Sequence, residues 1–512
     1  MLFNSYPFLF LYLPLTLLAF VVLRRGHRSL AIGGLFLASL IFYGVWNPRD
    51  VLLLLGSILF NFWIGQKLQK PAPASAKSRR LWLQLGIAID LGLLGYYKYA
   101  GFTAENLGTL LGIHFDLPPI LLPLGISFFT FTQIAFLVDC YRGEVREGRF
   151  LDYGLFVTYF PHLIAGPVLH HKEMMPQFRS AALSHFRWED FSIGATLFTM
   201  GLFKKVVFAD GIAPFARAVF DGPAGTPGFF EAWGGTLAFS FQLYFDFSGY
   251  SDMAIGLSRL FGVRLPVNFD SPYQALSLID FWRRWHMTLS RFLRDYLYFS
   301  LGGNRKGAFR RHLNLWLTMV LGGLWHGAGW TYLAWGALHG FYLIINHGFR
   351  HWAEGRMDPN RLRIPGQMLT FLCVIIGWVL FRSPDLETAG DLYRGMLGLH
   401  GFAIPESLIP ERARGALTHF GLTLAEPLAF SKLPGQTAGL SLWILGLGFI
   451  AFFCPNSQTL LGRYRPTLSQ TKALPQSFLF EPRRLTLFLT AAAFLFGLSS
   501  MGTVSEFLYF QF

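Results

Sequence analysis

Two histidines stand in this sequence where acid–base chemistry could occur, and the first is His326. It lies in the glycine-rich segment Leu321–Trp330, at the junction of two apolar runs. An ionisable side chain at membrane depth is rare and generally faces a cavity or a pathway. Histidine also has a pKa suited to proton transfer near neutral pH, and glycines let the backbone bend and a ligand approach closely. From the residues alone, a catalytic base and a core histidine hydrogen-bonded between helices are equally good interpretations.

The second histidine, His286, lies in the aromatic and basic segment Asp280–Met287. Taken alone, a histidine among tryptophans and arginines is more typical of a membrane interface than of a catalytic site. Two acids, Asp246 and Asp252, stand inside the apolar run Phe245–Asp252. Because an isolated carboxylate in such a run is costly, we expect each acid to pair internally or to orient a histidine.

The other histidines in apolar surroundings favour structural interpretations. His339 and His347 are eight residues apart, loosely on one helical face, and we expect packing or interfacial roles for them. His162, His170 and His171 flank a segment broken by prolines. They could line a chamber, although a structural role is again favoured.

Several common catalytic motifs are absent from the sequence: a GxxxxGK[ST] phosphate loop, GxGxxG after a strand, HExxH and GxSxG. Their absence removes the usual support for an ATP-driven pump, a nicotinamide enzyme, a zinc protease and an α/β-hydrolase. The three cysteines are far apart and form no CxxC pair, so neither a full disulfide framework nor a zinc site is expected. We therefore predict no bound metal and no permanently bound cofactor.

The composition separates this chain from soluble proteins. Apolar residues make up 53% of the 512 residues before the 54 glycines are counted, and charged residues make up only 14%. Soluble domains contain about 25% charged residues, so this chain has too little polar surface for a soluble particle. Its net charge of +14 comes from short basic clusters between apolar runs, a pattern of cytoplasmic loops rather than of a nucleic-acid surface. The composition predicts a polytopic membrane protein that binds no nucleic acid.

The elements that must position these residues are transmembrane helices. A helix needs about 20 apolar residues to cross a bilayer, and we expect about 11–13 such helices in a single all-α domain, residues 1–512. The first has no basic leader and no small-residue cleavage site, which favours a retained span over a removed signal peptide. The candidate spans are 3–23, 30–46, 50–66, 81–99, 118–138, 191–210, 231–260, 312–328, 330–348, 366–382, 441–455 and 485–501.

Two stretches do not fit a simple crossing. Residues 151–171 are apolar but interrupted by Pro161 and Pro167, and residues 261–310 mix aromatic and basic side chains. Broken backbone at membrane depth persists only where protein or a water-filled cavity surrounds it. We expect re-entrant or in-plane elements that line a central chamber open to the cytoplasm.

The distribution of basic loops predicts the topology. The basic loops 24–28 and 67–80 are separated by two spans, so both can face the cytoplasm, which puts the N-terminus outside. The same rule assigns the clusters 305–311 and 350–363 to the cytoplasm, and the long segment 383–440 and the C-terminal Phe512 to the outside.

Two motifs, Phe281–His286 and Leu324–Gly327, follow each other in an order that resembles the membrane-bound O-acyltransferase (MBOAT) superfamily. The likeness runs nearly from end to end of the chain and is weakest in 383–440. Three further segments are similar to the bacterial alginate O-acetylation branch of that superfamily, with the teichoic-acid D-alanylation protein as a cousin: Phe160–Pro167, Tyr244–Asp252 and Glu506–Phe512.

The resemblance implies an MBOAT fold and transfer of an acyl group, most simply acetyl from cytoplasmic acetyl-CoA, across the membrane. The product would be an O-acetylated exopolysaccharide such as alginate, or an O-acetylated cell-wall glycan. His326 matches the catalytic histidine and would act as general base, while His286 matches the second active-site position and would orient the acceptor or stabilise an oxyanion. The residues expected to contact substrates are Arg283 and Arg284, which would meet the CoA phosphates, Trp325 and Asp246.

The same resemblance implies an extracytoplasmic SGNH-type acetyltransferase as partner and a bacterial inner-membrane location with both termini outside. Two other functions stay open at this point. A polysaccharide or lipid-linked-saccharide transporter would share the aromatic chamber but would need no indispensable histidine. An inactive scaffold for an assembly complex would need none either.

Overall fold

The computed structural model describes residues 1–69, 76–145, 148–180, 183, 185–222, 226–358, 361–419, 423–469, 479–481, 483–502, 507 and 508. Every regular element in these ranges is a helix, which confirms the predicted all-α class. Most of the closing motif, including Phe512, lies outside the described residues. The side of the membrane assigned to the C-terminus therefore stays a prediction.

Each predicted span coincides with a helix or with consecutive helical segments. These are η1 and α1 (Phe8–Tyr12, Leu13–Gly26), α2 (Arg28–Gly44), α3 (Pro48–Gln69), α4 and η2 (Ala76–Leu94, Gly95–Tyr99), α6 (Ile126–Tyr141), α9 and η4 (Trp188–Phe203, Lys204–Ala209), α11 (Phe229–Leu260), α14 (Gly307–His326), α15 (Trp330–Ala353), α16 (Arg363–Arg382), α19 (Gln436–Phe453) and α21 (Arg484–Ser499). The expected start at residue 118 is wrong. Pro118, Pro119 and Pro123 keep that stretch extended, and the helix begins only after Gly125.

Five helices in the described ranges are long and apolar enough to cross a membrane: Phe8–Gly26, Pro48–Gln69, Trp188–Phe220, Arg363–Arg382 and Gln436–Phe453. Three shorter apolar helices accompany them, α2, α6 and α21. The predicted total of about 11–13 crossings stays a prediction, because only five of the described helices are long and apolar enough to be identified as membrane spans by length and composition alone.

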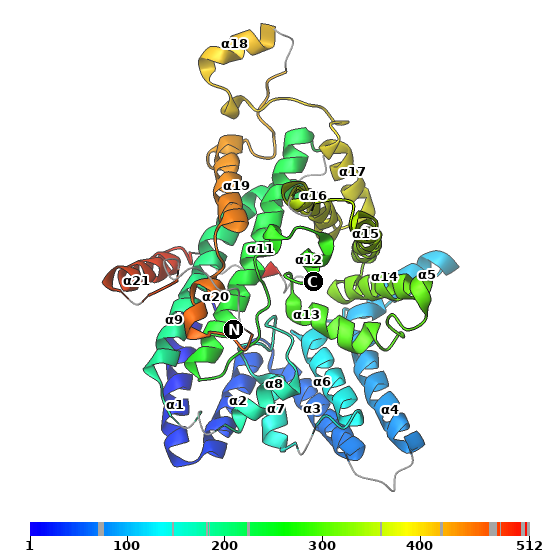
Figure 1. Cartoon of the computed structure of the whole chain (residues 1–512), viewed down its shortest axis with the longest axis vertical. Coiled ribbons are helices and arrows are strands. Elements are labelled where there is room, and N and C mark those ends of the chain that lie inside the picture. Colours follow the sequence, from blue (N-terminus) through cyan, green and yellow to red (C-terminus); the bar gives the residue numbers. More distant parts are fainter. Residues whose placement is uncertain are drawn as a thin grey trace.

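The central element is α11, a helix of 32 residues that is buried along nearly its whole length (Figure 1). Its first half belongs to a core shared with α10 (Asp210–Phe220), α16 and α19. Its second half belongs to a core shared with the N-terminal helices. Protein therefore surrounds α11 along most of its length, and the helix joins the two halves of the molecule.

Glycines bring α9 and α11 into backbone contact. A Cβ on Gly194 would lie 2.7 Å from the Gly256 carbonyl oxygen, and one on Gly201 would lie 2.6 Å from the Gly249 carbonyl oxygen. Both pairs use the same spacing of seven residues, so the small side chains share one face of each helix. Small residues that allow close approach are a main means of helix association in membranes.

The two irregular stretches are broken in the structure, as the sequence predicts. Helix α7 (Phe150–Thr158) ends before Pro161, and the backbone is non-helical until α8 (His171–Phe178), with every residue from 152 to 171 buried. The second stretch holds only short helices, among them α12 (Leu278–Trp282) and α13 (Met287–Phe292). The backbone N–H of Val168 donates to the Thr288 hydroxyl at 2.9 Å, so the two broken stretches meet.

The segment 383–440 divides into a packed part and a projecting part. Helix α17 (Leu386–Met396) packs into the core through Ala389, Leu392 and Met396. Helix α18 (Glu411–His419) projects from the end opposite the blue N-terminal helices (Figure 1). Helix α18 has no buried residue. The extracytoplasmic location of the segment 383–440 stays a prediction.

Candidate functional site

His326 is the last residue of α14, at the point where the helix gives way to extended backbone at Gly327. Its ring is buried, with ring centroids 5.0 Å from Trp325, 5.3 Å from Trp335 and 5.3 Å from Phe381. The predicted position at the end of an apolar span is confirmed. The imidazole is thus held at the end of a rigid helix by aromatic side chains.

His286 lies beside it, although forty residues separate the two histidines along the chain. Their ring centroids are 6.5 Å apart, and His286 is also buried, with its ring edge-on to Phe247 at 4.8 Å. The backbone of His286 is left-handed, at φ 43° and ψ 52°. Non-glycine residues in that region are uncommon and cluster at functional sites. The structure therefore brings the two predicted histidines together and strains one of them.

A single side-chain oxygen positions His286. Asn268 Oδ1 accepts from the Thr288 backbone N–H at 3.3 Å, from the Thr288 hydroxyl at 2.9 Å and from His286 Nδ1 at 3.2 Å. Because that oxygen can only accept, the proton in the last bond belongs to Nδ1, and the neutral ring keeps Nε2 as its acceptor. Sequence analysis did not single out Asn268, since a polar residue in an irregular stretch carries no pattern.

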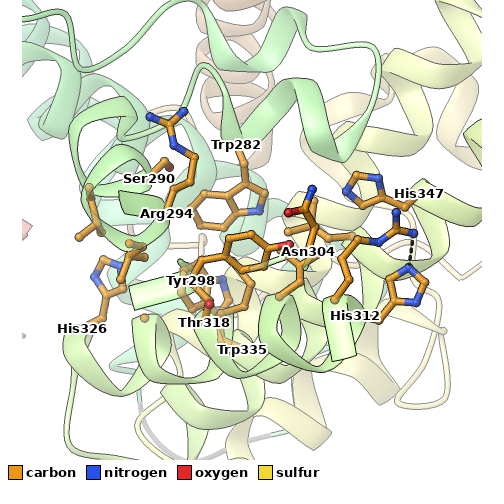
Figure 2. Close-up of a pocket in the computed structure, with 17 residues that line it drawn as sticks. Trp282, Ser290, Arg294, Tyr298, Asn304, His312, Thr318, His326, Trp335 and His347 are labelled. Carbon is orange, nitrogen blue, oxygen red and sulfur yellow. Dashed lines mark hydrogen bonds between the residues drawn. The ribbon is translucent and has the colours of Figure 1, made fainter. Parts of the chain in front are cut away.

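A large cavity of about 440 Å³ has His326 at one end (Figure 2). Trp282, Tyr298 and Trp335 line its middle, and His312 and His347 lie at the end away from His326. Most of its walls are apolar, and its cationic residues are Arg294 and Arg311. His347, which the sequence assigns to packing or an interface, is thus a cavity-lining residue.

A second, smaller cavity of about 120 Å³ also has His326 in its lining. Trp325 and Lys98 line it, together with the non-helical stretch Leu122–Gly125 and the start of α6. His326 is the one described residue that lines both cavities. The imidazole therefore forms the border between two separate spaces.

Lys98 is a residue of this site that sequence reasoning missed. Its ammonium donates to the carbonyl oxygens of Trp325 at 2.6 Å and of His326 at 3.0 Å. The signal was present, because Lys98 is an ionisable residue inside the apolar span 81–99. Such a residue is a candidate functional group by default.

The other expected substrate residues occupy different surroundings. Trp325 lines the small cavity, with its ring stacked on Phe131 at 5.2 Å. Arg284 pairs with Asp280 at 2.9 Å, Arg283 is exposed, and neither arginine lines the two cavities.

Asp246 lines neither cavity. It pairs with Lys205 at 2.6 Å, and its other oxygen accepts from the Leu508 backbone N–H at 3.0 Å. Lys204 pairs with Asp252 at 2.7 Å. The expectation that both acids pair internally is confirmed, and these pairs explain how α11 tolerates carboxylates and how η4 carries two lysines.

The expectation that the glycines around His326 face a ligand is wrong for two of them. A Cβ on Gly323 would lie 2.2 Å from the Tyr332 carbonyl oxygen, and one on Gly327 would lie 2.1 Å from the Tyr332 ring. These glycines let α14 and α15 pack closely. A bulky residue at either position would disrupt the helix pair rather than plug a passage.

His339 illustrates a structural histidine. It is fully buried between Trp282 at 5.4 Å and Trp335 at 5.0 Å, and its Nε2 would be 2.5 Å from a Cβ on Gly377. The absence of that Cβ makes room for the ring, in keeping with the packing role expected for His339. His162 is similar, since its Nε2 bonds the Phe156 carbonyl at 2.9 Å.

Comparison with known proteins supports an enzymatic site. The model of the membrane-bound O-acyltransferase family matches residues 139–383. The chain is 43% identical over 431 residues to the peptidoglycan O-acetyltransferase of Helicobacter pylori, covering 79% of this chain and 81% of that protein. It is 44% identical over 412 residues to the "Probable alginate O-acetylase AlgI" of Pseudomonas putida, covering 79% and 82%. It is also 29% identical over 290 residues to the teichoic acid D-alanyltransferase of Streptococcus thermophilus, covering 51% and 68%.

Proposed function

The chain belongs to the membrane-bound O-acyltransferase family, and from this premise we propose that it acetylates a glycan outside the cytoplasm with acetyl-CoA from inside. As a member of this family it is a polytopic membrane enzyme. The transporter and the inactive scaffold that the sequence left open are therefore set aside. The glycan we propose is alginate, another exopolysaccharide or peptidoglycan, because relatives named for alginate and for peptidoglycan are similar to equal degrees.

The observation that carries the proposal is the position of His326 between the two cavities. A donor in the large cavity and an acceptor in the small cavity could both reach this imidazole without either crossing the membrane. The charged part of CoA then stays in water, which avoids the cost of moving phosphates through hydrocarbon.

In the proposed reaction, His326 takes the proton of the acceptor hydroxyl as its oxygen attacks the thioester carbonyl. The tetrahedral intermediate collapses by breaking the carbon–sulfur bond, and the proton passes from His326 to the departing thiolate. The products are an acetyl ester and CoA. General base catalysis of this kind contributes typically about 10²–10⁴-fold to a rate.

For His286, the hydrogen bond to Asn268 favours one of the two roles that the sequence left open. With Nδ1 donating to Asn268, Nε2 of the neutral ring can accept a hydrogen bond but cannot donate one. Stabilising an oxyanion requires a donor. The single proton of the attacking hydroxyl goes to His326, so His286 cannot accept from that same group. We therefore assign His286 to orienting the acceptor by accepting from a second donor group of the acceptor molecule, which the 6.5 Å between the two ring centroids places close to His326.

For the donor, the large cavity supplies what acetyl-CoA requires. Its apolar middle suits the extended pantetheine arm, and Arg294 and Arg311 line the same space. Arginine binds phosphate with paired hydrogen bonds. We therefore assign the CoA phosphates to Arg294 and Arg311 in place of Arg283 and Arg284, which lie outside the cavity.

The proposed setting is a bacterial inner membrane, with both chain termini and the segment 383–440 outside. Charge counting puts the cluster 305–311, and so the part of the large cavity that Arg311 lines, on the cytoplasmic side. The acceptor is then either the glycan itself or an extracytoplasmic SGNH-type acetyltransferase that carries acetyl to it. No bound cofactor is required, since acetyl-CoA is a substrate.

The test is His326→Ala expressed in a deletion strain, with acetate released by alkali from the purified glycan as readout. We expect no acetate above the deletion background and a normal amount of protein in the membrane, because only the proton acceptor is lost. His339→Ala serves as a histidine control outside both cavities. Retention of more than a few per cent of wild-type acetylation by His326→Ala would contradict the assignment.

A further inference from the structure

Two consecutive residues of another helix hold the end of α14. Lys98 and Tyr99 stand in η2, which continues α4, more than 220 residues before His326 in the chain. The Tyr99 hydroxyl donates to the Leu324 carbonyl at 2.8 Å, and Lys98 donates to the next two carbonyls. The last three carbonyl groups of α14 are thus all bonded from η2.

These bonds are made at the C-terminal end of the helix, where the backbone carbonyl groups have no partners within the helix. The last four carbonyl groups of an α-helix lack partners within the helix, and its C-terminus carries a partial negative charge. A lysine there satisfies two carbonyls and complements the helix dipole. In the described residues no carboxylate pairs with Lys98, so the carbonyls of α14 and the more distant Ser127 hydroxyl, at 3.5 Å, are its polar contacts.

A π-helical turn brings Lys98 into this position. The segment Gly95–Tyr99 is wound more widely than the α-helix before it. Such turns are rare and occur often at functional sites. Here Lys98 and Tyr99, the last two residues of the turn, both reach carbonyl groups at the end of α14.

We propose that Lys98 is a positioning residue that fixes the end of α14 and so keeps the His326 imidazole at the border of the two cavities. This inference rests on the proposed acetyl transfer for its kinetic consequences, but its structural consequence is independent of any activity. The ammonium contacts the backbone of His326 and not the donor cavity. A loss of Lys98 should therefore slow turnover while acetyl-CoA binding persists.

The experiment compares Lys98→Met with Lys98→Arg in the full-length protein in membrane vesicles and in detergent. We expect Lys98→Met to lower kcat by about 10- to 100-fold, because misplacing a reacting group by about 1 Å can cost about 100-fold. The KM for radiolabelled acetyl-CoA should stay within about twofold of wild type. Lys98→Arg keeps the charge and the donors, and we expect it to recover most of the lost rate.

Hydrogen–deuterium exchange supplies a readout that does not depend on activity. In Lys98→Met, amides near residues 322–329 should exchange faster, while those at the other end of α14, near 310–316, should be unchanged. Lys67→Met is the matched control, because Lys67 lies on Trp63 at the end of α3 and outside both cavities. It should alter neither exchange in α14 nor kcat.

Each outcome is decisive. Unchanged exchange and unchanged kcat in Lys98→Met would overturn the positioning role. Unchanged exchange with a rate restored by higher acceptor concentration would also overturn it, in favour of direct acceptor binding in the small cavity. Faster exchange at 322–329 in a protein whose wild type transfers no acetyl group would refute the proposed function and leave the positioning role intact.

Discussion

The ion pair between Asp246 and Lys205 allows a test of whether Asp246 stabilises the fold or contacts a substrate. Both side chains are 2% exposed, and Lys205 Nζ also bonds Asp210 at 2.9 Å. The substitution Asp246→Asn preserves shape and an oxygen that can accept from the Leu508 N–H, but it removes the negative charge. We expect Lys205 to become a buried cation that has lost its shortest carboxylate contact, with the partly exposed Asp210 and the Phe507 ring still beside it.

The expected loss follows from that geometry. Removing one partner of a buried ion pair costs about 3–5 kcal/mol, because the remaining charge is left uncompensated. Because Asp210 still pairs with Lys205, we expect a loss at the low end of this range. The free energy of unfolding should fall by about 3 kcal/mol, or roughly 100-fold in the folding equilibrium. Adding Lys205→Met removes the uncompensated charge. The double variant should recover about 2 kcal/mol, since apolar replacements of buried pairs are often nearly neutral.

The assay is unfolding of the purified variants by SDS titration in mild detergent, together with glycan acetylation in cells. Asp391→Asn is the control, because Asp391 forms an exposed pair with Arg394 whose loss should cost under about 1 kcal/mol. A stable Asp246→Asn protein that has lost acetylation would refute this reasoning. It would return Asp246 to the substrate site.

Three further predictions concern packing, donor binding and sidedness. Gly256→Ala should lower the yield of monodisperse protein in size-exclusion chromatography, because its Cβ would meet the α9 backbone at 2.6 Å, whereas Gly446→Ala faces open space and should be neutral. Arg311→Ala should raise the KM for acetyl-CoA by about tenfold with kcat nearly unchanged, as lost phosphate contacts predict; a changed kcat alone would contradict that role. In spheroplasts, an impermeant thiol reagent should label Gly415→Cys but not Arg356→Cys, and the reverse pattern would invert the topology.

Much of the fold could be predicted because lipid imposes simple rules on sequence. Apolar runs of about 20 residues indicate membrane helices, and each of the twelve proposed spans is helical over at least part of its length. Prolines correctly predicted the break after Thr158. Other prolines delay the start of α6 to Ile126, and the sequence-based prediction did not take them into account. The number of crossings is harder to predict, since α11 is long enough to cross a membrane but is not among the helices whose composition alone qualifies them as spans.

The pairing of His326 with His286 could be proposed only from motifs typical of a family. Their contact depends on how the irregular stretch 261–310 folds, and hydrophobic periodicity does not predict the path of an irregular chain. The same limit explains the arginines. Arg284 and Arg294 stand in one basic, aromatic stretch and each pairs with a nearby aspartate, but only Arg294 lines the large cavity.

Glycines gave the least reliable prediction. A glycine permits close approach of a ligand or of another helix, and the sequence does not say which. At Gly323 the neighbour is the backbone of α15, so the residue serves helix packing. Lys98 shows the opposite case, in which a strong signal was present and the surrounding apolar run hid it.

The border at His326 also bears on how a membrane keeps its ion gradients. In the residues that the structure describes, the two cavities share one lining residue, an imidazole packed among Trp325, Trp335 and Phe381. Under the proposed function, the acetyl group passes this point by exchange of one bond for another. The enzyme could then serve both sides of a membrane without opening a water-filled path for ions between them.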